Sequence, residues 1–146
     1  KKIGFMADSV RVPTSTVSLI SLNITFRTEL NLTGDPIINR EFINDIYKKA
    51  ASGAQKDLLI FSENQNVSSD LVGCQAAVVI EGIENHTRTG FLPLSAEILR
   101  EYGIDTTQDI NLPVTHAKIF GWYDNEFGNY VNCLGKLTVY VDKNMI

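Results

Sequence analysis

Residues 20–27 constrain the fold more than any other stretch of the chain. Apolar and polar side chains alternate strictly there: Ile20, Leu22, Ile24 and Phe26 are separated by Ser21, Asn23, Thr25 and Arg27. Because successive side chains of a strand point to opposite faces, this pattern predicts a strand with one dry and one polar face. The dry face needs cover from another layer of the domain, and the polar face meets water or a wet subunit interface.

A helix is predicted over residues 39–52, where Asn39 serves as the N-cap and Gly53 ends the helix. Its apolar stripe consists of Phe42, Ile43, Ile46, Tyr47 and Ala50. Short strands are predicted before residue 13 (residues 3–12) and in "DLLIF" (57–61) and "QAAVVIE" (75–81). The polar segment "SENQNVSSD" between the last two is expected to be exposed.

The stretch from residue 82 to residue 113 carries weaker signals. Ser95 is a plausible cap for a short helix, "AEILREY", which Gly103 closes. Polar loops are expected on both sides of this helix. The next segment, "VTHAKIF" (114–120), is rich in β-branched and aromatic residues and predicts a strand.

Three consecutive polar residues, Asp124, Asn125 and Glu126, follow that strand. After them apolar residues recur at helical spacing: Phe127, Tyr130, Val131, Leu134, Leu137 and Val141, with Thr138 in the same pattern. At a strand-to-helix junction Asp124 or Asn125 can cap the helix, and Glu126 faces the positive end of the helix dipole. Alternatively, Asn125 presents its amide to a bound ligand, since ligands often bind where strands lead into helices.

These elements sum to an α+β fold, in which an antiparallel or mixed sheet has helices packed on one face. The 146 residues fit a single domain, and a composition of 44% hydrophobic and 21% charged residues fits neither disorder nor a membrane span. The net charge of −4 disfavours nucleic acid as a partner. Cys74, Cys133, His86 and His116 match no ligand spacing, so no metal site is expected.

Three sequence blocks resemble the glyceraldehyde-3-phosphate dehydrogenase family. "WYDNEFG" (122–128) is similar to a signature near the carboxyl end of that family. "RVPTSTVSLISLNI" (11–24) is similar to its "RVPT…VS" segment, and "SENQNVSSDL" (62–71) to its "TEHQVVSSDF". The blocks stand in the family's order, and the resemblance implies that family's C-terminal catalytic-domain fold.

The resemblance also implies an activity for the parent enzyme. In the family a cysteine thiolate attacks the aldehyde, hydride passes to NAD, and inorganic phosphate releases the acyl group. The nucleophilic cysteine of "SCTTNC", the histidine base and the dinucleotide-binding Rossmann domain are not found in residues 1–146. The chain is therefore expected to be a single, partial catalytic domain plus C-terminal helix, to contain no catalytic residue, and to be inactive alone.

Three site residues follow from the matched motifs. Arg11 of "RVPT" corresponds to an arginine that binds phosphate, for which a rigid guanidinium fork is suited. Asn125 of "WYDNEFG" corresponds to the asparagine that bonds the nicotinamide carboxamide of NAD. Tyr123 would lie beside the catalytic pair, or would simply pack as an aromatic at a strand end.

The family further implies glyceraldehyde 3-phosphate and inorganic phosphate as ligands, a cytoplasmic glycolytic enzyme and a homotetramer, with neither a nucleic-acid nor a membrane partner. Two features depart from the family: Asn129 replaces an aromatic expected near the nicotinamide, and residues 82–113 form an insertion. The alternative function is a stand-alone binding module that kept the fold without catalysis.

Overall fold

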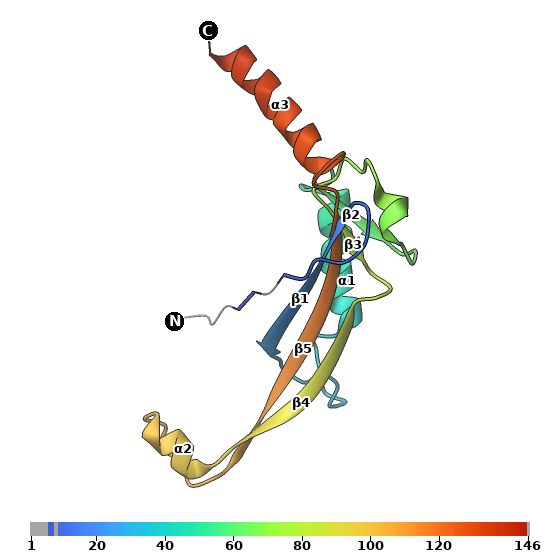
Figure 1. Ribbon diagram of the computed structural model, residues 1–146. Helices are drawn as coiled ribbons and strands as arrows, with labels where there is room; N and C mark the ends of the chain where they lie inside the picture. Colours follow the sequence, from blue (N-terminus) through green and yellow to red (C-terminus); the bar gives the residue numbers. More distant parts are fainter. Residues whose placement is uncertain (1–5, 8, 146) are drawn as a thin grey trace.

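A computed structural model describes residues 6–7 and 9–145 of the chain. Five strands form one mixed sheet, and helices accompany it (Figure 1). In chain order the elements are β1 (Ser18–Arg27), α1 (Arg40–Ser52), β2 (Leu59–Ser62), the 3-10 turn η1 (Ser68–Leu71), β3 (Val78–Glu81), β4 (His86–Leu94), α2 (Ala96–Glu101), β5 (Ile110–Tyr123) and α3 (Asn129–Asn144).

Strand β5 organises the sheet. One of its edges pairs antiparallel with the whole of β1, from Ser18 opposite Tyr123 to Arg27 opposite Val114. The other edge pairs antiparallel with β4 near its start and with β3 near its end, and β2 then adds to β3 in parallel. The predicted α+β class with a mixed sheet is confirmed.

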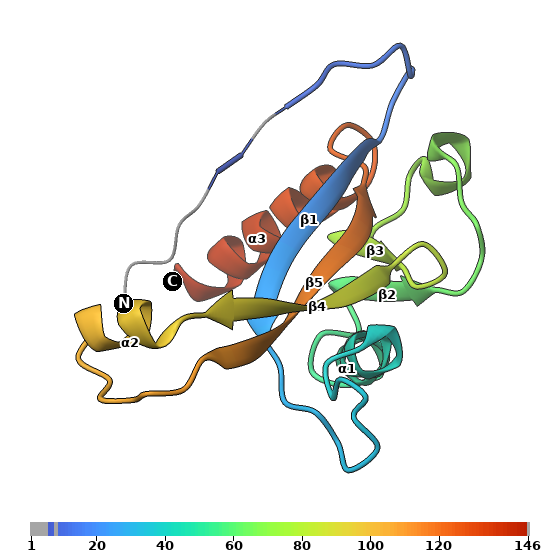
Figure 2. The same cartoon turned by 90° about the horizontal axis from the view of Figure 1, so that it is seen from below.

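The dry face predicted for β1 is confirmed only toward the end of the strand, because Ile20 and Leu22 on the same face stay 48% and 40% exposed. Ile24 and Phe26 pack on a cluster of buried residues from α1 and three strands: Ile43, Leu59, Ile80, Ala117 and Ile119. Helix α1 covers this face of the sheet, as Figure 2 shows from below. Each fully buried large aliphatic side chain contributes about 1.5–3 kcal/mol to stability, so this cluster stabilises the packing of α1 on the sheet.

Helix α1 has the predicted ends but a narrower apolar stripe. The Asn39 side chain accepts a hydrogen bond from the Phe42 amide at 2.8 Å, and Gly53 is the C-cap. The prediction for the stripe was partly wrong, because Phe42 and Ile46 remain 44% and 52% exposed. The helix meets the core through the row of Ile43, Tyr47 and Ala51, one turn apart.

Two predictions about the less regular segments were wrong. The strand expected over residues 3–12 is not present at residues 6–7 and 9–12, and the rest of that range lies outside the described residues. The loop expected before α2 is instead strand β4, which pairs with β5 as far as Leu94 opposite Ile110, whereas a loop does follow α2 at residues 102–109. Gly90 and Pro93 weaken the sequence signal for strand β4, because both residue types are uncommon inside strands.

Residues 86–113, called the arm below, are therefore a long two-stranded hairpin with α2 at its tip (Figure 1). Helix α2 has the predicted cap, since the Ser95 hydroxyl accepts from the Ile98 amide at 3.3 Å. Gly103 follows the helix with a positive φ of 80°, which a glycine adopts without a steric penalty.

Helix α3 exists as predicted but does not join the core. It extends from one end of the sheet (Figure 1), and Leu134 and Leu137 are 64% and 56% exposed. Its apolar spacing therefore does not cover the sheet in this chain. Within the described part of the chain, no helix combines the length and the apolar character needed to cross a bilayer.

Candidate functional site

The three family-like blocks meet at one end of the sheet, where β1 begins and β5 ends. Ser18 of "RVPTSTVSLISLNI" lies opposite Tyr123 of "WYDNEFG", so these two blocks are neighbours in the sheet. Val17, Leu71 and Val79 form a buried cluster there, against which Trp122 packs. Leu71 belongs to the block "SENQNVSSDL". Side chains from all three blocks therefore lie in one cluster, although the blocks are separated by about fifty residues along the chain.

Asp124 is the polar centre of this junction and is only 1% exposed. Its Oδ1 accepts hydrogen bonds from the amides of Glu126 and Phe127, both at 2.9 Å. Its Oδ2 accepts from the amide of Gly73 at 2.7 Å. One carboxylate thus fixes the turn that follows β5 and ties that turn to the segment after η1.

The electrostatics of Asp124 follow from these contacts. Burial by itself raises the pKa of a carboxyl group, because it removes water from the charged form. The backbone amides of Phe127, Gly73, Glu126 and Gly128 act in the opposite direction and hold the pKa of Asp124 below its ordinary value. Asp124 is therefore a charged structural anchor at neutral pH.

The prediction that Asp124 or Asn125 caps the last helix was wrong. Helix α3 begins at Asn129, and its N-cap is Gly128. Gly128 has no side chain that could accept a hydrogen bond from the first amides of the helix. Asp124 instead closes a separate turn over Glu126 and Phe127. Spacing alone did not reveal the extra turn, because its stability depends on the distant amide of Gly73.

The glycine of "NEFG" is required by a close approach of the backbone. A Cβ atom at Gly128 would lie 2.2 Å from the carbonyl oxygen of Cys74 and 2.9 Å from Cβ of Asp124. The neighbouring Asn129 is buried and donates from Nδ2 to the carbonyl of Ala77 at 2.8 Å. Asn129 therefore joins α3 to the segment before β3.

Arg11 lies on the exposed approach to β1, in a segment without helix or strand. Its guanidinium forms no hydrogen bond or ion pair with the residues that the structure describes. Val17, six residues later, has a positive φ of 69° although it is β-branched, which is a genuine backbone outlier. Strain of this kind persists where surrounding packing enforces it, here through Leu71 and Val79.

Asn125 and Tyr123 lie next to the buried anchor. The Asn125 side chain is exposed and bonds to no described residue, so its amide is available for a ligand. Tyr123 is half-buried, and its ring centre is 6.3 Å from that of Tyr130 at the start of α3. Tyr130 was expected only as part of an apolar helix stripe, but it is 59% exposed and adds an aromatic surface beside Tyr123.

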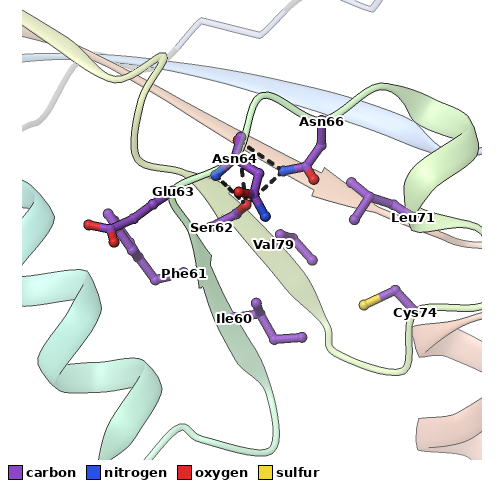
Figure 3. Close-up of a pocket in the computed structure, with 9 residues that line it drawn as sticks. All are labelled: Ile60, Phe61, Ser62, Glu63, Asn64, Asn66, Leu71, Cys74 and Val79. Carbon is purple, nitrogen blue, oxygen red and sulfur yellow. Dashed lines mark hydrogen bonds between the residues drawn. The ribbon is translucent and has the colours of Figure 1, made fainter.

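A hollow of about 360 Å³ lies along the block "SENQNVSSDL" at residues 62–71 (Figure 3). Its polar rim comes from Ser62, Asn64 and Asn66, and its apolar wall includes Leu71 and Val79. Asn66 donates from Nδ2 to the Ser62 hydroxyl at 2.8 Å and to the Asn64 carbonyl at 3.2 Å. Neither Arg11, Tyr123 nor Asn125 lines this hollow, so it is separate from the predicted ligand contacts.

Arg11 and Asn125 are both exposed, and no hydrogen bond or ion pair joins their side chains. Arg11 offers a phosphate-binding fork and Asn125 an amide that both donates and accepts. Among the described residues no group of three or more His, Cys, Asp or Glu side chains is placed to hold a metal ion. Cys74 and Cys133 are free and half-buried, less enclosed than core thiols.

The fold and the junction define a class: an α+β domain in which a buried carboxylate fixes a turn at the end of a mixed sheet. A family profile described as "Glyceraldehyde 3-phosphate dehydrogenase, C-terminal domain" matches residues 2–92. The chain belongs to this family, as the resemblance of its three blocks predicted.

Curated relatives agree with that assignment. Glyceraldehyde-3-phosphate dehydrogenase 1 of Streptomyces avermitilis is 32% identical over 135 residues, which are 92% of this chain and 30% of that protein. Glyceraldehyde-3-phosphate dehydrogenase 2 of the same organism is 29% identical over 94% of this chain and 31% of that protein. The enzyme of Sclerotinia sclerotiorum is 31% identical over 92% of this chain. The chain thus spans about 30% of the length of the curated relatives that it matches.

Proposed function

We propose that this chain is the later part of the catalytic domain, with the C-terminal helix, of an NAD-dependent phosphorylating glyceraldehyde-3-phosphate dehydrogenase. The observation that supports the proposal is the meeting of all three family-like blocks around Val17 and Asp124. A chain that had kept only the sheet would not need a buried carboxylate to hold the "WYDNEFG" turn against a distant segment. The parent is proposed to be a cytoplasmic, homotetrameric enzyme of glycolysis.

Arg11 is proposed to bind phosphate, either as inorganic phosphate or as part of glyceraldehyde 3-phosphate. Its exposed guanidinium has its donors free toward solvent, and its fork matches two phosphate oxygens at once. The strained Val17 fixes the end of the segment that carries Arg11. The packing of Val17, which follows Arg11 in the chain, would thereby orient the segment that carries Arg11.

Asn125 is proposed to orient the nicotinamide ring of NAD, which supplies the hydride acceptor when bound. The exposed amide of Asn125 complements a carboxamide, because each group has both a donor and an acceptor. Tyr123 and Tyr130 would border the ring, and Tyr130 then takes the place of the aromatic that Asn129 replaces. These contacts fit one end of the cofactor only, so tight binding of NAD by this chain alone is not expected.

The proposal is tested in a chimaera in which residues 1–146 replace the matching segment of Streptomyces avermitilis glyceraldehyde-3-phosphate dehydrogenase 1. The chimaera is expected to reduce NAD in the presence of glyceraldehyde 3-phosphate and phosphate. Arg11→Lys should lower kcat/KM by about ten- to a hundredfold, because the charge stays but the fork is lost. The loss should appear in the phosphate or substrate dependence, with the NAD dependence nearly unchanged.

Arg40→Lys is the matched control, because Arg40 is an exposed arginine at the start of α1. It should leave all kinetic constants unchanged. If the chimaera does not fold, phosphate is titrated into the 146-residue chain, and the Nε–H proton of the Arg11 guanidinium is followed by NMR. A folded chimaera with no activity, or an Arg11→Lys variant with normal saturation curves, favours the alternative of a stand-alone binding module.

A further inference from the structure

The position of the Asn125 amide depends on one turn. The Asn125 side chain is exposed and bonds to no described residue, so the backbone on either side of it sets where the amide lies. Asp124 closes that backbone, because its Oδ1 accepts hydrogen bonds from the amides of Glu126 and Phe127, both at 2.9 Å. The carbonyl of Asp124 also accepts from the Asn129 amide at 3.0 Å. Asn125 is therefore the first residue of a turn whose geometry Asp124 determines.

The carboxylate of Asp124 is itself held by a distant amide. Its Oδ2 accepts a hydrogen bond from the Gly73 amide at 2.7 Å, although Gly73 lies 51 residues earlier in the chain. Because Asp124 is only 1% exposed, solvent does not supply another donor if this bond is lost. The carboxylate therefore keeps its position only while the Gly73 amide points at it.

Gly73 delivers this amide through an unusual backbone conformation. Its φ is 77°, in the left-handed region, and the Cys74 amide then donates to the Leu71 carbonyl at 3.1 Å. A Cβ atom added at Gly73 would meet no atom within 4 Å. Conformation rather than space therefore requires the glycine, and the substitutions that fit best are those that tolerate a positive φ.

We propose that Asp124 and Gly73 are positioning residues for the nicotinamide of NAD, which place the amide of Asn125 without contacting the cofactor. This inference rests on the proposed role of Asn125 and adds the segment after η1 to that site. A group that orients the ring acts on the rate of the chemical step, since small misplacements of reacting groups are costly. Affinity for NAD depends less on it, because the contacts proposed here fit one end of the cofactor only.

Steady-state kinetics of the chimaera test the proposal. Asp124→Asn turns an amide nitrogen toward the Gly73 amide or toward the turn, so the turn should shift. We expect kcat to fall by about ten- to a hundredfold, while KM for NAD changes by less than about threefold. Ile43→Ala is the matched control: it removes a buried side chain under α1, away from the turn, and should leave both constants of the folded enzyme unchanged. Circular dichroism selects a temperature at which every variant is folded.

Substitutions at Gly73 separate conformation from bulk. Asparagine adopts a positive φ more readily than other residues with a side chain, whereas β-branched valine does so rarely. Gly73→Asn should therefore lower kcat by less than about threefold, and Gly73→Val by about as much as Asp124→Asn. Equal losses in the asparagine and valine variants would show that the backbone conformation of Gly73 does not control the site.

A double-mutant cycle shows whether Asp124 acts through Asn125. Asn125→Ala alone should lower kcat, and adding Asp124→Asn should then change kcat by less than about twofold, because nothing remains to be positioned. If the two losses multiply, Asp124 acts by another route and this inference is wrong, although the role of Asn125 stands. If Asn125→Ala leaves kcat unchanged, the proposed role of Asn125 fails, and this inference fails with it.

NMR relaxation of the 146-residue chain gives a test that needs no active chimaera. In the wild type the backbone amides of residues 125–128 should be as rigid as those of β5. Asp124→Asn and Gly73→Val should lower their order parameters from about 0.85 to below about 0.6, whereas Gly73→Asn should not. A turn that stays rigid in both Asp124→Asn and Gly73→Val overturns the proposal.

Discussion

Strand β5 begins in the arm and ends in the signature turn at residues 124–128, and its two ends are stabilised in different ways. At the carboxyl end the buried carboxylate of Asp124 accepts hydrogen bonds from three backbone amides. There Gly128 also lets the turn approach the backbone of Cys74 closely. At the amino end the strand is held by pairing with β4, and no side chain from Ile110 to Val114 is fully buried. The comparison teaches that specific residues are required where backbone meets backbone, whereas strand pairing tolerates many side chains.

The largest expected difference comes from the same substitution at both ends. Gly128→Ala should destabilise the chain by about 3 kcal/mol or more, because the added Cβ would overlap the carbonyl of Cys74. Gly90→Ala in the arm meets no atom within 4 Å and should be neutral or stabilise by about 0.5 kcal/mol. Urea unfolding measures the free energy of unfolding of both variants. Equal losses of stability in the two variants would refute the proposed difference between the two ends of β5.

A smaller loss is expected for Asp124→Asn. If the amide oxygen keeps the bonds from Glu126 and Phe127, the amide nitrogen faces the Gly73 amide, and two donors then meet. The free energy of unfolding at pH 7 should fall by about 2 kcal/mol. Asp109→Asn is the control in the arm: its oxygen can still accept the bond from the Ala96 amide, so stability should hardly change.

The pH dependence of stability tests the charge of Asp124. Its pKa is held below the ordinary value in the folded chain, so its contribution is complete above the unfolded value of about 4 and is lost as the pH falls through the folded pKa. The difference in stability between wild type and Asp124→Asn should be constant from pH 7 to about pH 5 and shrink below about pH 4. A difference that grows on acidification would show that Asp124 is protonated in the native state.

The smallest global effect is expected at the tip of the arm. Leu99 is 6% exposed, and Leu99→Ala should remove the packing of α2 without reaching the main core. The global free energy of unfolding should change by less than about 1 kcal/mol, while amide exchange in α2 becomes faster. Exchange in α2 should already exceed that of β1 in the wild type. Protection of the tip equal to that of β1 would mean that arm and sheet unfold as one unit.

The sequence predicted the regular elements well where local signals agreed. The alternation in residues 20–27 gave β1, and Asn39 and Gly53 gave the ends of α1. The arm was missed because Gly90 and Pro93 weaken a strand signal, whereas β4 exists through its pairing with β5. Similarly, the start of α3 was misplaced because Asp124 is satisfied by a distant amide.

For the candidate site, sequence motifs identified Arg11, Tyr123 and Asn125, and their ligand roles remain predictions. The motifs did not reveal that Tyr130 lies beside Tyr123, because side-chain neighbours across a turn depend on how α3 leaves the sheet. They also did not reveal the strain at Val17, which depends on the burial of its side chain among Leu71 and Val79.

By itself the sequence determined the α+β class, the family and the ends of α1, because periodicity, capping and motif order are properties of neighbouring residues. Only the tertiary structure decided which residues meet. It placed Asp124 against Gly73, brought Gly128 against the carbonyl of Cys74, and set Tyr130 beside Tyr123. The physical reason is that pairing and burial join segments whose separation along the chain carries no local signal, so they are settled only when the sheet forms.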